Sequence, residues 1–215
     1  MKGDKKPCAF IEDCAVAPEK LLDYYHRLDK IIREHGTEGS YCGHSSVGLM
    51  HIRPGINLKM ESEIEKMISI QEQTADLVLE FGGAMSGEHG DGLARSHLIP
   101  KFFGPKLNNA FREVKRVFDP EGLMNPGKIV DGDPFTDNFR ISPTYKTVPI
   151  PTIMDFSSDG GFARAIEMCN GVGACRKRDG TMCPSFQVTN EEEHSTRGRA
   201  NALREVISGG IEGED

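Results

Sequence analysis

The sequence predicts an α+β fold in which an antiparallel sheet carries both of its helices on one face. Apolar residues recur at helical spacing in two segments, and short runs typical of strands lie before, between and after them. Glycines follow both helical segments, where chains commonly leave a helix. The resulting order, β-α-β-β-α-β, is the ferredoxin-like pattern.

The first half of this order begins with residues 8–16 (CAFIEDCAV), which read as a strand. Pro18 then opens a helix, because proline is tolerated in a first helical turn, and Gly36 suits the position just after the helix end. Residues 39–54 read as two short strands around Val47-Gly48. The apolar positions that predict the helix are Leu21, Leu22, Tyr25, Leu28, Ile31 and Ile32.

The second half is predicted in the same way. A helix runs from about 61 to 81, Gly82-Gly83 ends it, and residues 84–86 begin another extended segment. A further helix is predicted over 105–118, followed by a turn at 119–122.

Composition divides the chain into three parts. Residues 1–130 form the predicted α+β domain. Residues 131–161 are rich in Pro, Gly, Ser and Asp and predict an irregular linker. Residues 162–215 carry three clustered cysteines and predict the truncated start of a second domain.

The overall charge excludes some functions. The net charge is −7 and the pI about 5.5, so nucleic acid is not an expected partner. No apolar stretch approaches the roughly 20 residues of a membrane-spanning helix, and the polar N-terminus does not resemble a signal peptide. Six unevenly spread cysteines favour a reduced, cytoplasmic protein with one cysteine site over a disulfide scaffold.

His44 and His51 suggest a metal site. They are seven residues apart, with Val47-Gly48 midway. If the turn is centred there, residue 44 lies directly opposite residue 51, and such residues share a face with Cβ atoms about 5 Å apart. Two imidazoles so placed reach one metal ion at about 2.0–2.1 Å. A metal site needs a third ligand, so the pair alone also fits one core and one surface histidine.

A third ligand is available in the glycine-rich segment 83–92 (GAMSGEHGDG). Its glycines indicate close approach of the backbone to a ligand or to another backbone. Successive side chains of an extended segment point to opposite sides. Glu88 is therefore predicted to bind the metal while His89 acts separately as a general base. A glycine-rich turn with a solvated Glu-His pair fits the same local pattern.

Arg53 and Arg95 lie close to these residues in sequence. Either arginine can hold a substrate carboxylate through its guanidinium fork. Either is equally explained, taken alone, as a surface charge.

Two segments together resemble the C-terminal domain of the FAD-linked oxidases. They are GAMSGEHGDG over 83–92 and FDPEGLMNPGKI over 118–129. That family includes D-lactate dehydrogenases, glycolate oxidase subunits and D-2-hydroxyglutarate dehydrogenases. The resemblance covers about residues 5–130.

The resemblance implies a site and its cofactors. A divalent metal, usually zinc, would be bound by His44, His51 and Glu88. His89 would take the hydroxyl proton of a 2-hydroxyacid while the α-hydride goes to the flavin of FAD. Asn125 and Lys128 belong to the Asn-Pro-Gly-Lys segment, which falls near the flavin in such proteins.

The segment between the two histidines departs from the family pattern. It reads HSSVGLMH here, where the family has His-x-Gly-Asp-Gly-Asn-x-His. Arg53 stands two residues after His51, where D-2-hydroxyglutarate dehydrogenases often have Asn. An arginine there suits an additional carboxylate, and the hypothesis is a dicarboxylic hydroxyacid.

Cys169, Cys175 and Cys183, the last before a proline, resemble the first half of a two-cluster ferredoxin motif, C-x2-C-x2-C-x3-C-P. Val172 replaces one cysteine, and the last interval is longer. The set is incomplete for a 4Fe–4S cluster, so further ligands are expected after Asp215. Residues 182–200 (MCPSFQVTNEEEHSTRGRA) resemble bacterial fusions of a FAD-linked oxidase to an iron–sulfur domain. A zinc site or free thiols are the alternatives.

Together these features predict a fragment of a FAD-dependent D-2-hydroxyacid dehydrogenase, with D-2-hydroxyglutarate the favoured substrate. Electrons would pass from FAD through an iron–sulfur domain to an acceptor. The same hypothesis extends to peripheral attachment of the protein to the inner membrane through that acceptor. The fragment lacks the flavin-binding domain and is predicted to be inactive alone, and its exposed sheet favours a homodimer. A zinc hydrolase using His44, His51 and Glu88, or a catalytically silent interaction module, are the alternatives.

Overall fold

The computed structural model describes residues 2–211. They form two compact units: Lys5–Ser142, and residues 2–4 together with 143–211. Part of the predicted linker belongs to the first unit, because Phe135 and Phe139 pack against its core and the Phe135 ring stacks on His97 at 4.8 Å.

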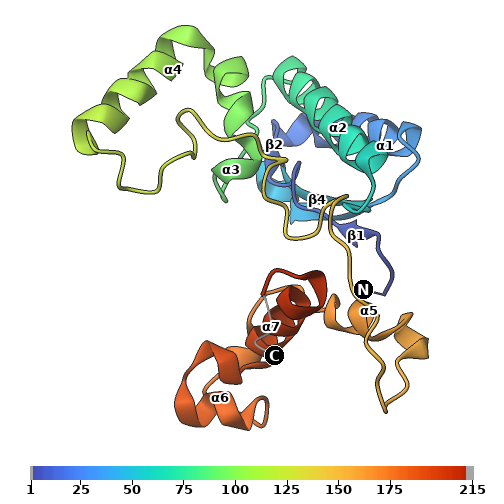
Figure 1. Ribbon diagram of the computed structural model, residues 1–215. Helices are drawn as coiled ribbons and strands as arrows, with labels where there is room; N and C mark the ends of the chain where they lie inside the picture. Colours follow the sequence, from blue (N-terminus) through green and yellow to red (C-terminus); the bar gives the residue numbers. More distant parts are fainter. Residues whose placement is uncertain (1, 212–215) are drawn as a thin grey trace. The chain divides into compact units, whose positions relative to one another are not determined.

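The first unit contains a small sheet built around one strand, β4 (Leu49–Ile56), which pairs antiparallel with each of the other three strands. The helices α1 and α2 lie together on one face of this sheet (Figure 1). The predicted α+β class is confirmed. The other elements of the unit are β1 (Lys6–Pro7), β2 (Cys14–Ala15), α1 (Leu21–Glu34), β3 (Gly39–His44), α2 (Glu61–Glu80), α3 (Gly92–Arg95) and α4 (Ile99–Phe118).

The two faces of β4 have different surroundings, because side chains alternate along a strand. Ile52 and Ile56 are fully buried in the core beneath the helices. His51 and Arg53 occupy the alternate positions and therefore point away from the helices. The helices contribute fully buried side chains to the same core, namely Tyr24, Leu28, Ile32, Ile70 and Val78.

The prediction of one continuous strand over 8–16 is wrong. Only Lys6–Pro7 and Cys14–Ala15 pair with β4, and the chain turns between them. Asp13 has a left-handed backbone with φ of 80°, which an extended strand does not allow. This backbone conformation directs the Asp13 side chain toward the loop that carries Glu88 and His89.

Two later elements also differ in extent. The predicted strand beginning at 84 is reduced to one antiparallel bridge between Ala15 and Ala84. The predicted helix over 105–118 is present as the larger part of α4, which begins at Ile99 and is interrupted at Gly104 by a non-helical backbone.

The connection between β3 and β4 is longer than the predicted two-residue turn. It is a single 3-10 turn, Ser45–Val47, ended by Gly48 at φ 70°. The register pairs His44 with Leu49 and Cys42 with His51. The prediction that His44 lies opposite His51 is therefore wrong, but both side chains remain on one face because their pairing positions differ by two residues.

Gly48 offers a test of this connection. Its backbone is left-handed, and an added Cβ would lie 1.8 Å from the carbonyl oxygen of Val16. Gly48→Ala is expected to lower the free energy of unfolding by about 3 kcal/mol or more, because it combines backbone strain with overlap. Urea unfolding followed by circular dichroism measures the loss.

Gly36→Ala is the matched control for Gly48→Ala. Gly36 has a similar φ of 66°, and nothing lies within 4 Å of an added Cβ. Only the backbone strain of about 1–2 kcal/mol is expected there. Equal losses for the two variants would show that the contact with Val16 does not restrict Gly48.

Within its described residues, the regular secondary structure of the second unit consists of helices alone, joined by irregular segments. Ser195 caps its longest helix by accepting a hydrogen bond from the Gly198 amide at 2.9 Å. Its helices are α5 (Phe162–Ile166), α6 (Pro184–Thr189) and α7 (Thr196–Ser208), with short 3-10 segments between them. Across residues 2–211, none of the helices has the length and apolar character needed to cross a membrane.

Candidate metal and catalytic site

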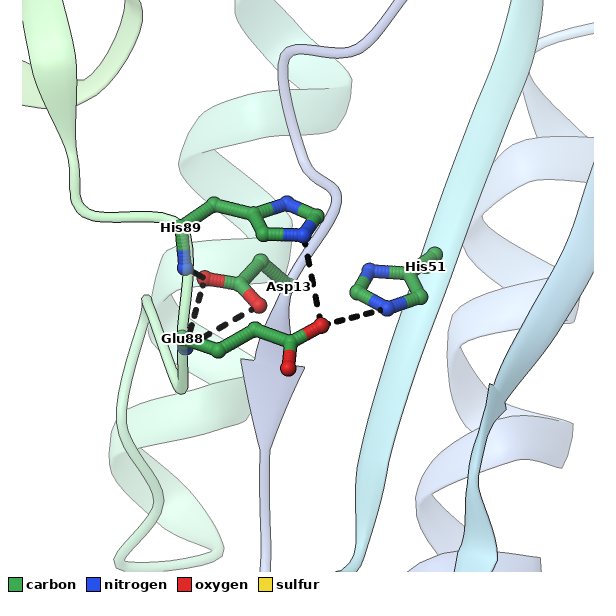
Figure 2. A group of neighbouring side chains, drawn as sticks. All are labelled: Asp13, His51, Glu88 and His89. Atoms are coloured by element: carbon green, nitrogen blue, oxygen red, sulfur yellow. Dashed lines mark hydrogen bonds and ion pairs between the residues drawn. The ribbon is translucent and has the colours of Figure 1, made fainter.

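Three separate stretches of the first unit meet on the helix-free face of the sheet. The turn before β2 carries Asp13, strand β4 carries His51, and the loop after α2 carries Glu88 and His89. One ligand atom from each of these four residues lies within 4.8 Å of all the others (Figure 2). This His–Glu cluster is the largest such group of potential metal ligands among the described residues.

Glu88 is the centre of the cluster. Its Oε1 atom lies 3.0 Å from His51 Nε2, 3.2 Å from His89 Nε2 and 3.5 Å from His44 Nε2. The His51 and His89 rings are stacked at 4.7 Å. One carboxylate oxygen therefore faces three imidazole nitrogens.

The expectation that Glu88 and His89 point to opposite sides is wrong. Both side chains reach the same cluster (Figure 2), because the segment is a loop in which side chains do not alternate as in a strand. His44 is more exposed than His51, with 58% and 12% of their side-chain surfaces accessible. His51 Nδ1 is buried, and no hydrogen-bond partner lies beside it in the described part of the chain.

Asp13 holds this loop in place. Its buried carboxylate accepts hydrogen bonds from Ser86 Oγ at 2.5 Å, from the His89 amide at 2.8 Å and from the Glu88 amide at 3.1 Å. Burial acts to raise the pKa of the Asp13 carboxyl, but these hydrogen bonds outweigh burial and hold that pKa below its usual range. The Asp13 oxygens are thus engaged with the loop, which explains why Asp13 is one of the four members of the cluster.

The glycine-rich segment does approach another backbone, which was one of the two predicted reasons for its composition. A Cβ added at Gly83 would lie 2.4 Å from the carbonyl oxygen of Ala15. Ala15 and Ala84 also exchange two backbone hydrogen bonds, of 3.0 and 2.8 Å. The loop is therefore joined to β2 just before it reaches Glu88.

Glu12 and Asp13 are the site residues that the sequence reasoning missed. Both lie inside an apolar run that was interpreted as a strand. The available signal was the pair of adjacent carboxylates in that run, because a strand buries alternate positions and one of two neighbouring acids would have to face the core.

The two predicted arginines have different environments. Arg53 is about half exposed, and its Nε donates to Glu12 Oε2 at 2.7 Å. Arg95 is buried and donates to the backbone carbonyls of Glu12 and Gly90, with its Nε 3.5 Å from Asp91 Oδ1. Arg53 therefore borders the cluster as a side chain that a solute can reach, whereas Arg95 joins two backbone segments.

Asn125 and Lys128 lie on the exposed loop after α4. Asn125 has a left-handed backbone with φ of 49°, and Lys128 Nζ donates to the carbonyl of Pro126 at 3.5 Å. Within residues 2–211, no hydrogen bond or ion pair joins either residue to the His–Glu cluster.

The three clustered cysteines lie in the second unit around the start of α7. Cys175 Sγ accepts from the Arg197 amide at 3.3 Å, and Cys183 Sγ accepts from the Thr196 amide at 3.4 Å. Contact with the Thr196 hydroxyl, at 2.8 Å from the sulfur, is the largest cause that lowers the pKa of the Cys183 thiol. Cys169 and Cys175 both line one hollow beside Arg197.

The helix-backed sheet with a His–carboxylate cluster on its open face defines an α+β domain suited to binding a metal or a polar substrate. Residues 1–129 match the model of the family described as FAD linked oxidases, C-terminal domain. The chain belongs to this family.

Among curated relatives, the D-2-hydroxyglutarate dehydrogenase of Haemophilus influenzae is 34% identical over 214 residues, which covers 96% of this chain and 20% of the relative. The enzyme of the same name from Pseudomonas putida is 35% identical over 213 residues, covering 96% and 21%. A D-lactate dehydrogenase from Archaeoglobus fulgidus is 30% identical over 129 residues, covering 60% and 28%. The chain spans about a fifth of the length of the first two relatives.

Proposed function

We propose that this chain is the substrate-side part of a FAD-dependent D-2-hydroxyacid dehydrogenase that oxidises D-2-hydroxyglutarate. The convergence of three imidazole nitrogens on Glu88 Oε1, at 3.0 to 3.5 Å, carries the proposal. The similarity to D-2-hydroxyglutarate dehydrogenases over 96% of the chain supports the choice of substrate.

The donor set fits a divalent metal. In a tetrahedral site with bonds of about 2.0–2.1 Å, neighbouring ligand atoms lie about 3.3–3.4 Å apart. The distances from Glu88 Oε1 to His44 Nε2 and His51 Nε2, 3.5 and 3.0 Å, bracket that value, although His44 is not in the group of four ligand atoms described above. We assign His44, His51 and Glu88 as the ligands of a zinc-like ion, whose chemistry at this place is to polarise a substrate hydroxyl and carboxylate.

His89 is the base in this proposal. Its Nε2 atom is 3.2 Å from Glu88 Oε1, so a hydroxyl held beside Glu88 lies within reach of that nitrogen. His89 receives the hydroxyl proton at Nε2. Bound FAD supplies the acceptor for the hydride that leaves the substrate α-carbon.

Arg53 is assigned to the second carboxylate of the substrate. It lies two residues beyond His51 on the same face of β4, and its side chain is about half exposed. The guanidinium fork suits a carboxylate. Arg95 is assigned instead to positioning the loop, because it is buried and occupied by backbone carbonyls.

The remaining assignments concern electron transfer. We propose that Asn125 and Lys128 border the flavin and that residues 162–215 belong to an iron–sulfur domain, with Cys169, Cys175 and Cys183 among the cluster ligands. Two backbone amides at the start of α7 already donate to two of these sulfurs, which is a contact that stabilises thiolates. An iron–sulfur cluster at this place supplies one-electron transfer to an external acceptor.

Metal removal tests the central proposal. In the flavin-containing enzyme that includes this chain, treatment with a chelator is expected to abolish dye reduction by D-2-hydroxyglutarate, and added Zn²⁺, Co²⁺ or Mn²⁺ is expected to restore it. Parallel metal analysis of His51→Ala should show loss of the ion. His26→Ala, on an exposed position of α1, is the control that should keep it.

Each other outcome points to a different function. Hydroxyacid oxidation that persists after complete metal removal contradicts the metal assignment but keeps the dehydrogenase. A bound metal without flavin reduction by any 2-hydroxyacid favours a hydrolase. Absence of both metal and turnover favours an interaction module.

A further inference from the structure

A hollow of about 200 Å³ lies where the end of α2, the glycine-rich loop, α3 and the start of α4 meet (Figure 1). Its apolar wall includes the buried side chains of Met85, Leu98 and Ile99. Leu79 and Phe103 also line it and are partly exposed, so the hollow is open to solvent beside them. In the described part of the chain, none of the four members of the His–Glu cluster lines this hollow. It is therefore a separate feature of the first unit.

The wall of the hollow also contains a buried charged pair, Asp91 and Arg95. Arg95 is only 5% exposed, and its two terminal nitrogens donate to the backbone carbonyls of Glu12 and Gly90. Its Nε atom makes no hydrogen bond within residues 2–211. Asp91 Oδ1 lies 3.5 Å from it, longer than the roughly 2.7–3.2 Å of a normal hydrogen bond. A buried N–H group without an acceptor is costly, so this atom indicates that a hydrogen-bond acceptor binds in the hollow.

The charged pair also restricts the charge of that acceptor. Asp91 is the counter-ion of the Arg95 guanidinium, and the pair together is neutral. An anionic ligand would face the Asp91 carboxylate in a place that holds little water, where repulsion between like charges is strong. A neutral carbonyl oxygen accepts a hydrogen bond from Nε without adding a charge. The chemistry of the wall therefore favours a neutral carbonyl compound.

The volume and the apolar wall restrict the size of the ligand. An apolar cavity of about 150 Å³ is large enough to bind benzene, so a hollow of about 200 Å³ accommodates one six-membered ring with a small substituent. Ligand sites in proteins are commonly apolar with a few polar groups that fix orientation. Leu98 and Ile99 supply apolar contacts here, and Arg95 Nε supplies the orienting donor.

We propose that this hollow binds a small neutral compound with one ring and a carbonyl group, whose oxygen accepts from Arg95 Nε. Ser86 and Asp91 both line the hollow, and in the sequence they stand on either side of Glu88 and His89. A bound compound therefore contacts the loop before and after the two site residues and restrains it. This second ligand site goes beyond the proposed dehydrogenase function, because its chemistry excludes the hydroxyacid anion.

Three probes of similar size test the binding. Acetophenone carries the carbonyl, ethylbenzene lacks it, and benzoate adds a negative charge. In the 215-residue chain labelled with ¹³C-methyl methionine, acetophenone should shift the Met85 signal, assigned by comparison with Met85→Leu. The signal of Met67, a buried core residue of α2, should stay in place. We expect ethylbenzene to bind about 5-fold more weakly than acetophenone, the usual net effect of one hydrogen bond, and benzoate more weakly still.

Asp91→Asn tests the role of the charged pair. The variant keeps the shape of the side chain but leaves the Arg95 cation without its counter-ion, so benzoate should now bind more tightly than acetophenone. Asp76→Asn is the matched control, because Asp76 is an exposed acid paired with Lys101, and it should keep the original order. Burial raises the pKa of the Asp91 carboxyl, so the titrations are made in weakly alkaline buffer, where this group is ionised. If Asp91→Asn does not fold, the three probes on the unmodified chain still decide.

Hydrogen exchange measures the effect on the loop. Saturation with acetophenone should slow exchange of the Glu88 and His89 backbone amides, because a ligand that binds only the closed loop lowers the population of open states. Peptides from α1 that do not line the hollow are the internal control. Exchange that is unchanged in the loop would contradict the restraint.

Four results would overturn the binding proposal. Two of them are equal affinities for acetophenone and ethylbenzene, and an unmoved Met85 signal with every probe. A third is displacement of acetophenone by D-2-hydroxyglutarate, which would make the hollow part of the substrate site. The fourth is binding to the 215-residue chain that is lost in the flavin-containing enzyme, because another part of that protein then covers the hollow. None of these measurements needs turnover, so a failure of the proposed function is seen separately.

Discussion

Replacement of His89 by asparagine is expected to lower kcat for D-2-hydroxyglutarate oxidation about 10²- to 10⁴-fold, the usual contribution of a general base. His89 Nε2 is the nitrogen directed toward the cluster, and its ring is stacked on His51 at 4.7 Å. Asparagine retains the backbone amide that Asp13 binds but cannot accept a proton. Stopped-flow reduction of the bound flavin measures the chemical step directly.

The His89→Asn result has two controls. His26→Asn makes the same change on an exposed position of α1 and should leave flavin reduction unaffected. Metal content should persist in His89→Asn, since His44, His51 and Glu88 remain. If the metal is lost together with activity, His89 is a ligand, and the separation of roles between His89 and His44 is wrong.

Replacement of Asp13 by alanine is expected to lower the free energy of unfolding of the first unit by about 2–4 kcal/mol. The change leaves two backbone amides and the Ser86 hydroxyl without their acceptor, and each unsatisfied buried group costs about 1–3 kcal/mol. Asp13 is fully buried in the structure. Because the chain contains no tryptophan, urea unfolding is followed by circular dichroism.

Two further variants define the role of Asp13. Asp76→Ala removes an acid that is mostly exposed and paired with Lys101, and a loss of under about 1 kcal/mol is expected there. Asp13→Asn keeps one acceptor oxygen and should lie between the two. If Asp13→Ala behaves like Asp76→Ala, the 86–89 loop is held by other contacts.

The helices α1 and α2 and the pair of strands β3 and β4 follow from local sequence signals, because helical periodicity and terminal glycines act within a few residues. The strands predicted over 8–16 and from 84 do not. The register of the hairpin formed by β3 and β4 does not follow from such local signals. Ser45–Val47 form a 3-10 turn and Gly48 completes the connection, which shifts the pairing of His44 by two positions. Such a turn depends on how Gly48 packs against Val16, a contact between residues distant in sequence.

The candidate site shows more clearly which structural features local sequence signals do not predict. His44, His51, Glu88 and His89 are recognisable from residue type and spacing, and the structure brings their side chains together. Asp13 and Glu12 act through the shape of a turn that the apolar run around them conceals. The left-handed backbone of Asp13 and the ion pair of Glu12 with Arg53 are tertiary features. The two adjacent acids indicate that the run is not a simple strand, but they do not indicate which groups each acid contacts.

The alternation of β4 has a consequence for how substrate preference changes over time. Ile52 is buried in the hydrophobic core, whereas Arg53, its immediate neighbour, lies on the opposite face of the strand and is about half exposed. Under the proposed assignment of Arg53 to the second substrate carboxylate, we expect a mutation there to change which acid is accepted without altering the core, because core packing and substrate contact fall on different residues of one strand. We expect related proteins to diversify at this position first, and to do so without compensating changes beneath the helices.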